Sequence, residues 1–275
     1  MRKYLDERNN CWVNEFQNIN EFVKYLRTQP INGAFRKFST LPSEQVGTSM
    51  TKFSNTETYK EAEDLLLNGW NEYTEEVKNQ IKNPTVNMQE IKKISMYDVL
   101  GFQCSVPRYI QGIPTSMINR KNVVVKQKIV DVTKLISYGY KTSTQTIIKE
   151  SIKAIRIIQC LESQGFRVNL NIAFGSVAKS GRGFICKVKI KSCNERLNIS
   201  KLMFPLIHPA MLRRIYLKWV EVFPETLCSM TKNYGYTMPT YKFSQVLKNS
   251  HLLPPMISGE GMVKNLEELK NLAIY

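Results

Sequence analysis

Apolar and polar residues alternate along three short stretches in the second half of the chain. Residues 123–132 are rich in valine and isoleucine, residues 166–174 alternate large apolar side chains with Arg and Asn, and residues 183–191 alternate apolar side chains with Lys187, Lys189 and Lys191. Successive side chains of a strand point to opposite faces, so the pattern predicts three strands. The three lysines should then share one face.

A long amphipathic helix is expected between the first two of these strands. Thr142 and Gln145 form a capping box at its start, and Gly165 suits its end. A strand, a helix and a strand in this order predict a right-handed crossover and a parallel pair of strands. The fold class expected is therefore α/β, with a partly parallel sheet covered by helices, as in Rossmann-like folds.

The first 95 residues are predicted to be a helical region. Residues 18–28 have Asn18 or Asn20 as an N-cap, a capping box begins the helix that follows Thr58, and a third helix covers residues 74–82. Near the other end of the chain, short helices are expected from Asn198 and from Pro209, and the tail should end in a helix near residues 264–273.

Residues 96–121 contain two prolines and two glycines and show no sustained period. Their apolar residues, such as Tyr97, Phe102, Tyr109 and Ile110, have surface to bury, which predicts an ordered loop rather than a loose linker. Such a loop serves function or is a strap packed across a domain surface. The domain organisation expected is a helical region over 1–95, an ordered Pro/Gly-containing strap over 96–121 and a basic α/β domain over 122–275.

The net charge of +16 is concentrated in the second part of the chain. Residues 1–95 carry 13 basic and 13 acidic residues, whereas residues 96–275 carry 26 and 10. Between Arg120 and Lys201, 17 basic residues face four acidic ones. A positive field of this density attracts phosphate backbones or an acidic partner.

Several classes of protein are not expected. No apolar run is long enough to span a membrane and the first residues lack the apolar core of a signal peptide, so we expect a cytoplasmic protein without a membrane partner. The six cysteines are scattered, without the close pairs of a zinc ribbon. They are expected to be reduced, structural thiols.

Four stretches carry a resemblance to a known family. They are the run from Thr58 to Trp70, the segment VPRYIQGIP with Met117, the helix and strand from Ser143 to Arg167, and the segment LNISKLMFPLIHPAMLRRI. Together they resemble a domain of unknown function in tailed-phage proteins. The resemblance implies a phage-encoded protein in a bacterial host cytoplasm or a virion, and it implies no activity.

A second resemblance is architectural. The strand, long helix and further strand look like the opening of a von Willebrand factor A domain, which holds a divalent metal with an Asp-x-Ser-x-Ser turn. Here Asp131 and Thr133 match the first two ligands, and Ser137 falls two positions late. Hard cations need several converging oxygens, so no metal site is expected.

Catalytic chemistry has few candidates. His208 and His251 are the only histidines, and residues 174–183 lack the spacing of a phosphate-binding loop. His208 is expected to cap a helix, and Asp98, Asp131 and Glu150 have no spacing that demands metal chemistry. We therefore expect no catalytic residues, no cofactor and no enzyme activity, and a metal-dependent enzyme remains the third alternative.

The basic residues are the strongest candidate for function. Lys149, Lys153 and Arg156 form one stripe of the long helix, opposite its apolar face. A second group consists of Lys179, Arg182, Lys187, Lys189 and Lys191. The first hypothesis is a non-enzymatic protein that contacts nucleic acid through phosphates. The alternatives are a solvated face that serves solubility, and a protein-interaction or virion-assembly module. If the two basic groups lie on opposite faces of the protein, the assembly module is favoured over nucleic-acid binding.

Arg213 and Arg214 are neighbours on the helix that begins at Pro209. Neighbouring helical positions point about 100° apart, so the two guanidinium groups cannot share one outward direction. We predict that one anchors the domain on a carboxylate or on exposed carbonyls and that the other joins the basic surface.

Overall fold

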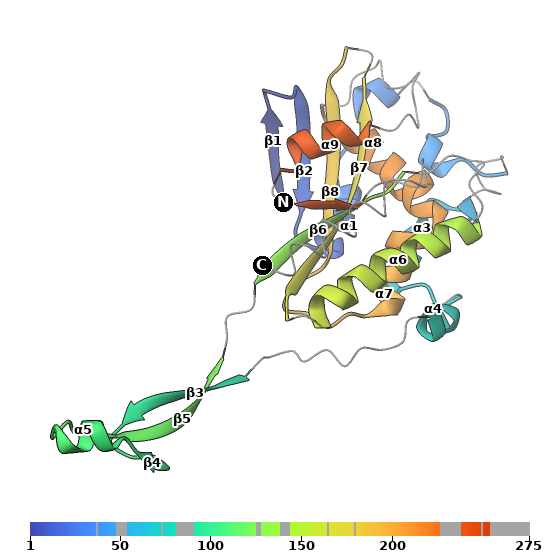
Figure 1. Ribbon diagram of the computed structural model, residues 1–275. Helices are drawn as coiled ribbons and strands as arrows, with labels where there is room; N and C mark the ends of the chain where they lie inside the picture. Colours follow the sequence, from blue (N-terminus) through green and yellow to red (C-terminus); the bar gives the residue numbers. More distant parts are fainter. Residues whose placement is uncertain are drawn as a thin grey trace.

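The protein is described from a computed structural model (Figure 1). The structure describes residues 1–253 except 37, 48–53, 73, 81–90, 125–127, 138–143, 164, 179, 226–237 and 249. The helix expected at 264–273 lies outside these residues, as do Thr142 and Lys179.

A six-stranded mixed sheet forms the centre of the body. Its strands, in spatial order, are β1 (Arg2–Asp6), β2 (Cys11–Phe16), β8 (Gly183–Lys191), β7 (Arg167–Val177), β6 (Ile129–Leu135) and β9 (His251–Leu253). The pairs β2–β8, β6–β7 and β6–β9 are parallel, and β1–β2 and β7–β8 are antiparallel. The predicted α/β class is confirmed, and β6, the long helix and β7 form the predicted parallel crossover.

Helices cover both faces of this sheet. The larger core lies on one face, where the helical elements are α1 (Ile19–Thr28), η1 (Gly33–Phe35), η2 (Pro42–Glu44), α3 (Tyr59–Asn68), α4 (Thr74–Gln80), α6 (Thr144–Ser163), α7 (Ile199–Ile207), the π-helical turn η3 (Met211–Tyr216) and α8 (Leu217–Val222). On the other face, α9 (Thr240–Val246) covers a smaller core that contains Cys11, Val13 and Ile185. Within the described part of the chain, no helix is long and apolar enough to cross a membrane.

The sequence predicted a helical region over residues 1–95, but this region also contains strands. Residues 2–16 form β1 and β2, and β2 pairs with β8 in the central sheet. The helices α1 and α3 do begin at the predicted caps, where Asn18 accepts from the Glu21 amide and Thr58 accepts from the Glu61 amide. Both helices pack in the larger core, so a boundary at residue 95 does not divide the core.

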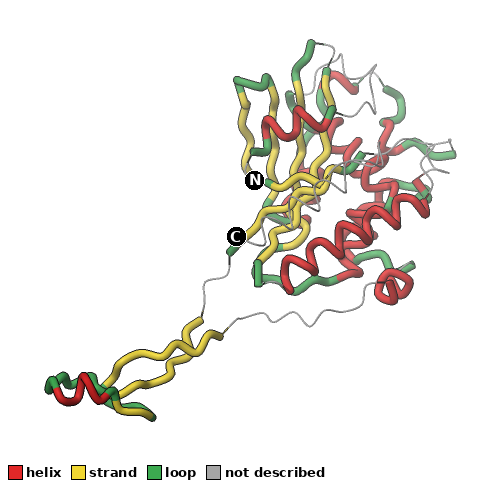
Figure 2. Tube along the Cα trace, viewed as in Figure 1, coloured by secondary structure: helices red, strands yellow, loops and turns green. Residues whose placement is uncertain are grey.

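Residues 91–124 form an arm rather than a strap. The arm is a small antiparallel sheet of β3 (Ile91–Asp98), β5 (Met117–Val124) and β4 (Gln103–Cys104), with the short helix α5 (Val106–Ile110) at its end. Figures 1 and 2 show it standing away from the sheet and its helices. The sequence analysis expected a loop without regular structure over residues 96–121, whereas most of this segment forms strands and a helix.

Arg214 holds a loop against the body, as predicted for one of the two arginines. It is fully buried, and its guanidinium donates to the carbonyls of Ser43, Gln45, Thr56 and Glu57 at 2.7–3.0 Å. Glu221, also buried, accepts from the Ser43 amide and hydroxyl at 2.9 and 2.5 Å. These contacts fix the chain on both sides of residues 48–53.

Candidate functional site

The helical basic stripe is on the surface, as predicted. Lys149, Lys153 and Arg156 are exposed on α6, and Lys153 pairs with Glu150 at 2.6 Å. The apolar side of α6, with Ile148 and Ile155 among its residues, packs into the larger core. The stripe therefore points away from the sheet on the α6 side of the body.

Lys187 and Lys189 lie on the opposite side of the sheet. Val188 and Cys186 face the larger core, so the residues that alternate with them face the side of α9. Lys187 pairs with Glu15 of the neighbouring β2 at 3.5 Å, and Lys189 donates to the Gln17 side chain at 3.0 Å. The two predicted basic groups do not form one surface.

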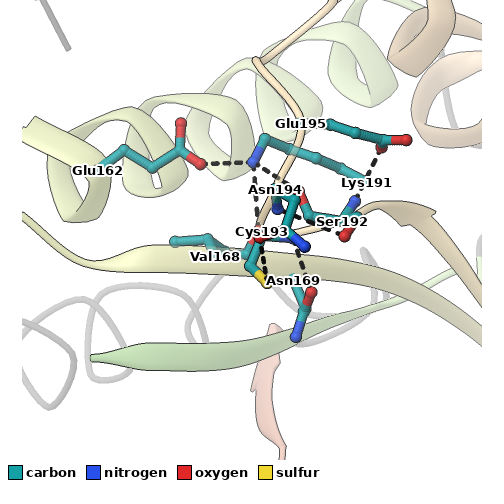
Figure 3. Close-up of polar contacts among 8 residues, drawn as sticks. All are labelled: Glu162, Val168, Asn169, Lys191, Ser192, Cys193, Asn194 and Glu195. Carbon is teal, nitrogen blue, oxygen red and sulfur yellow. Dashed lines mark hydrogen bonds and ion pairs between the residues drawn. The ribbon is translucent and has the colours of Figure 1, made fainter. Parts of the chain in front are cut away.

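Lys191 is not part of the exposed group, and this prediction is wrong. Leu170 of β7 pairs with Lys191 while Asn171 pairs with Lys189, so a bulge leaves Ile190 without a partner of its own. One extra residue reverses the alternation and turns Lys191 toward the α6 face. There its ammonium, 3% exposed, donates to Glu162 at 2.5 Å and to the carbonyls of Val168 and Ser192 at 3.2 Å (Figure 3).

The remaining members of the second group are also dispersed. Lys179 lies outside the described residues, and Arg182 is half-buried, donating to the Asn10 side chain at 3.2 Å. A cavity of about 170 Å³ does bring Lys189, Lys191 and Lys201 together beside the start of α1, but Glu195 lines it too. The cavity is therefore not a purely cationic site.

The arm carries most of the large hydrophobic side chains that the described residues expose. Eight of the fourteen large exposed hydrophobic side chains belong to it, and Leu100 and Ile110 are 78% and 77% exposed. The eight, called the apolar tip below, are Met96, Tyr97, Val99, Leu100, Phe102, Val106, Tyr109 and Ile110. The other six, Met1, Leu5, Ile31, Val46, Ile129 and Tyr241, are scattered over the body.

The tip is an organised structure. Arg108 donates to the carbonyl and hydroxyl oxygens of Thr115 at 3.1 Å, and its guanidinium lies 4.2 Å from the centre of the Tyr97 ring. Arg120 lies 4.7 Å from the centre of the Phe102 ring. A side chain at Gly101 would place its Cβ 2.2 Å from the carbonyl oxygen of Ile118, so only glycine fits this crossing. The apolar side chains are thus exposed on a fixed scaffold.

Nearly all of this architecture lies within one family match. A family model covers residues 4–267. The chain belongs to the family described as domain of unknown function (DUF7192). No curated protein and no solved structure matches the chain. The matched range includes the arm as well as both faces of the body.

Burial shifts the pKa of three groups that could support catalysis. Burial lowers the pKa of His208 to about 4, and its Nδ1 accepts from the Ala210 amide at 3.2 Å, which confirms its capping role. Burial lowers the pKa of Lys134 to about 8, and nearby Glu150 partly offsets this effect. Burial raises the pKa of the Cys11 thiol to about 12, which leaves it protonated at neutral pH.

One residue of the partial metal motif, Thr133, uses its hydroxyl in a contact within the protein. The Thr133 hydroxyl lies 2.5 Å from that of Ser250, whose oxygen also lies 3.3 Å from the Asp131 carbonyl. Among the residues that the structure describes, no three His, Cys, Asp or Glu side chains lie close enough to hold a metal ion.

Proposed function

We propose that this protein is a non-enzymatic interaction module that docks other protein surfaces through its arm. The observation that carries the proposal is the apolar tip, which gathers most of the large hydrophobic side chains exposed in the described structure. Single exposed hydrophobic residues are ordinary on protein surfaces, whereas a concentration of them in one small element favours an interaction site.

The size of the apolar tip fits a protein partner. At roughly 100 Å² of exposed surface for each large side chain, eight of them present on the order of 800 Å². A standard interface buries about this much on each partner. Aromatic residues, methionine and arginine are enriched in such interfaces, and the arm offers Tyr97, Phe102, Tyr109 and Met96 beside Arg108 and Arg120.

The proposed setting is the assembly of a phage particle in a bacterial cytoplasm. The resemblance of four segments to tailed-phage proteins supports this setting, and so does a fold in which a compact body carries a projecting arm. Phage or host proteins would then be the partners.

Site-specific photocrosslinking tests the proposal. A benzophenone amino acid is placed at Tyr109 in the apolar tip or, as the control, at Tyr241, which is 59% exposed on the body. We expect protein adducts from position 109 in cells that express the gene, and their loss when Leu100 and Ile110 are both changed to Ser. No protein adduct at 109, or equal adducts at 109 and 241, would overturn the proposal.

Nucleic-acid binding is the second candidate, supported by the exposed stripe of Lys149, Lys153 and Arg156 and the net charge of +16. Contacts to phosphates release counterions, so affinity should fall steeply with salt. Changing the three residues to Gln should lower the slope of log K against log salt by about 3 for duplex DNA. The control changes Lys24 and Lys60, exposed on α1 and α3, to Gln. No affinity at low salt, or equal slopes for both variants, would exclude the stripe.

A further inference from the structure

We propose that the cavity beside the start of α1 binds the phosphate group of a small phosphate monoester. The cavity has a volume of about 170 Å³ and lies where four segments of the body meet. These are the turn from β2 into α1, the last turn of α3, the end of β8 with the turn that follows it, and the first turn of α7. The inference does not involve the arm and goes beyond the proposed function.

The first argument is the charge of the cavity lining. Lys189, Lys191 and Lys201 line the cavity, and Glu195 is the one acidic residue among the described lining residues. The Glu195 carboxylate is turned toward the Ser192 amide, from which it accepts at 3.0 Å (Figure 3). The lining therefore carries more positive than negative charge, which favours an anion as the ligand.

The second argument is that two of the three lysines have no carboxylate partner. Lys191 is 3% exposed, and Glu162 balances its charge at 2.5 Å. Lys189 donates instead to the amide oxygen of Gln17 at 3.0 Å. Neither Lys189 nor Lys201 forms an ion pair with an acidic residue of the described chain. A phosphate dianion in the cavity supplies the negative charge that both ammonium groups lack.

The third argument comes from the two helices that begin at the cavity. The first turns of α1 and α7 contribute Asn20 and Lys201 to its lining, and the start of a helix favours negative charge. In α1, Glu21 accepts from the Gln17 amide at 2.7 Å and does not line the cavity. In α7 the first turn has no acidic residue and carries Lys201, which opposes the helix dipole. A bound anion offsets this unfavourable placement.

The fourth argument is the size of the cavity. Pockets that hold drug-sized molecules have volumes of about 300–1,000 Å³, so a volume of about 170 Å³ calls for a smaller ligand. Ile19, Leu66 and Leu67 form an apolar part of the lining, which suits the carbon atoms of an ester better than a second phosphate. These features together favour one phosphate group with a short carbon chain.

Isothermal titration calorimetry of the full chain with inorganic phosphate and with glycerol phosphate tests the inference at low salt. We expect a dissociation constant of about 1 mM or lower, raised about tenfold by Lys189→Gln or by Lys201→Gln, because each change removes a charged hydrogen-bond donor. The control is Lys24→Gln, which removes the same charge from an exposed position of α1 outside the cavity. No binding up to about 10 mM, or equal weakening by the Lys24 and Lys201 variants, would overturn the inference.

Glu195→Gln should change the affinity in the opposite direction. Glutamine keeps an oxygen that accepts from the Ser192 amide, but it removes the negative charge from the cavity. The affinity for phosphate should therefore increase, by about fivefold. An unchanged or lower affinity would show that the charge of the cavity does not govern binding, and the inference would fail.

Competition distinguishes a monoester from a nucleic-acid backbone. A short single-stranded DNA without terminal phosphates carries only diester phosphates, so it should leave the binding of glycerol phosphate unchanged, whereas inorganic phosphate should compete with it. Equal competition by this DNA would assign the cavity to contacts with a nucleic-acid backbone and would contradict the monoester inference. None of these outcomes bears on the crosslinking at position 109, so the inference and the proposed function can fail separately.

Discussion

Changing Arg214 to Lys should weaken the attachment of the loop that this arginine holds against the body. The guanidinium donates to four carbonyls that belong to two separate segments, Ser43 with Gln45 and Thr56 with Glu57. A lysine ammonium has three donors on a single atom, so it cannot span both pairs of acceptors. At least one of the four carbonyls would then lose its partner.

The expected loss of stability follows from this count. A buried polar group left without a hydrogen bond costs about 1–3 kcal/mol. With one or two carbonyls left unpaired, we expect Arg214→Lys to lower the free energy of unfolding by about 3 kcal/mol, and Arg214→Met to lower it further. The neighbouring Arg213 is partly exposed, so Arg213→Lys should change stability by less than about 0.5 kcal/mol.

Urea denaturation followed by far-ultraviolet circular dichroism measures these differences. The midpoint should fall for Arg214→Lys with the slope unchanged, since the surface exposed on unfolding stays the same. Faster amide exchange at residues 42–47 would locate the effect in the held loop. Equal midpoints for the Arg213 and Arg214 variants would show that the four hydrogen bonds do not stabilise the fold, and the reasoning would fail.

Three further changes test other contacts. The pKa of His208 is depressed to about 4 in the folded chain, so its contribution to stability is complete above about pH 6.5 and falls as the pH drops toward 4. The free energy of unfolding should therefore fall between pH 7 and pH 5 by about 2 kcal/mol more for the native chain than for His208→Gln. Lys191→Met should cost about 3 kcal/mol because it leaves Glu162 buried and unpaired, and adding Glu162→Leu should restore most of the loss in urea denaturation; no recovery would contradict this account. Gly101→Ala should speed amide exchange throughout the arm without lowering the melting temperature of the body, whereas Gly112→Ala, which meets no atom within 4 Å, should have only a local effect of about 1 kcal/mol. Similar exchange in both glycine variants would contradict the close crossing at Ile118.

The parts of the fold that the sequence predicts are those in which a buried face imposes a period. The helix α6 and the strand β7 show their apolar faces directly, and the caps at Asn18 and Thr58 use local hydrogen bonds that depend on a few neighbouring residues. The anchoring role of one arginine in the pair 213–214 also followed from helix geometry, although the sequence did not indicate which one.

The parts that the sequence missed have physical causes as well. The position of Lys191 depends on a bulge, which changes the direction of a side chain without changing the alternation of residue types. The arm lacks a periodic pattern because it is a sheet with little core, so neither of its faces selects for apolar residues at every second position. The pairing of β2 with β8 joins residues about 170 positions apart, and no local signal encodes it.

This long-range pairing determines the order in which parts of the chain can fold during synthesis. β2 lies between β1 and β8, so the N-terminal hairpin must wait for residues 183–191 before the central sheet can close. The arm needs only residues 91–124, and contacts that are local in sequence form early. On the ribosome, therefore, the arm can fold and expose its apolar tip while the central sheet of the body is still incomplete.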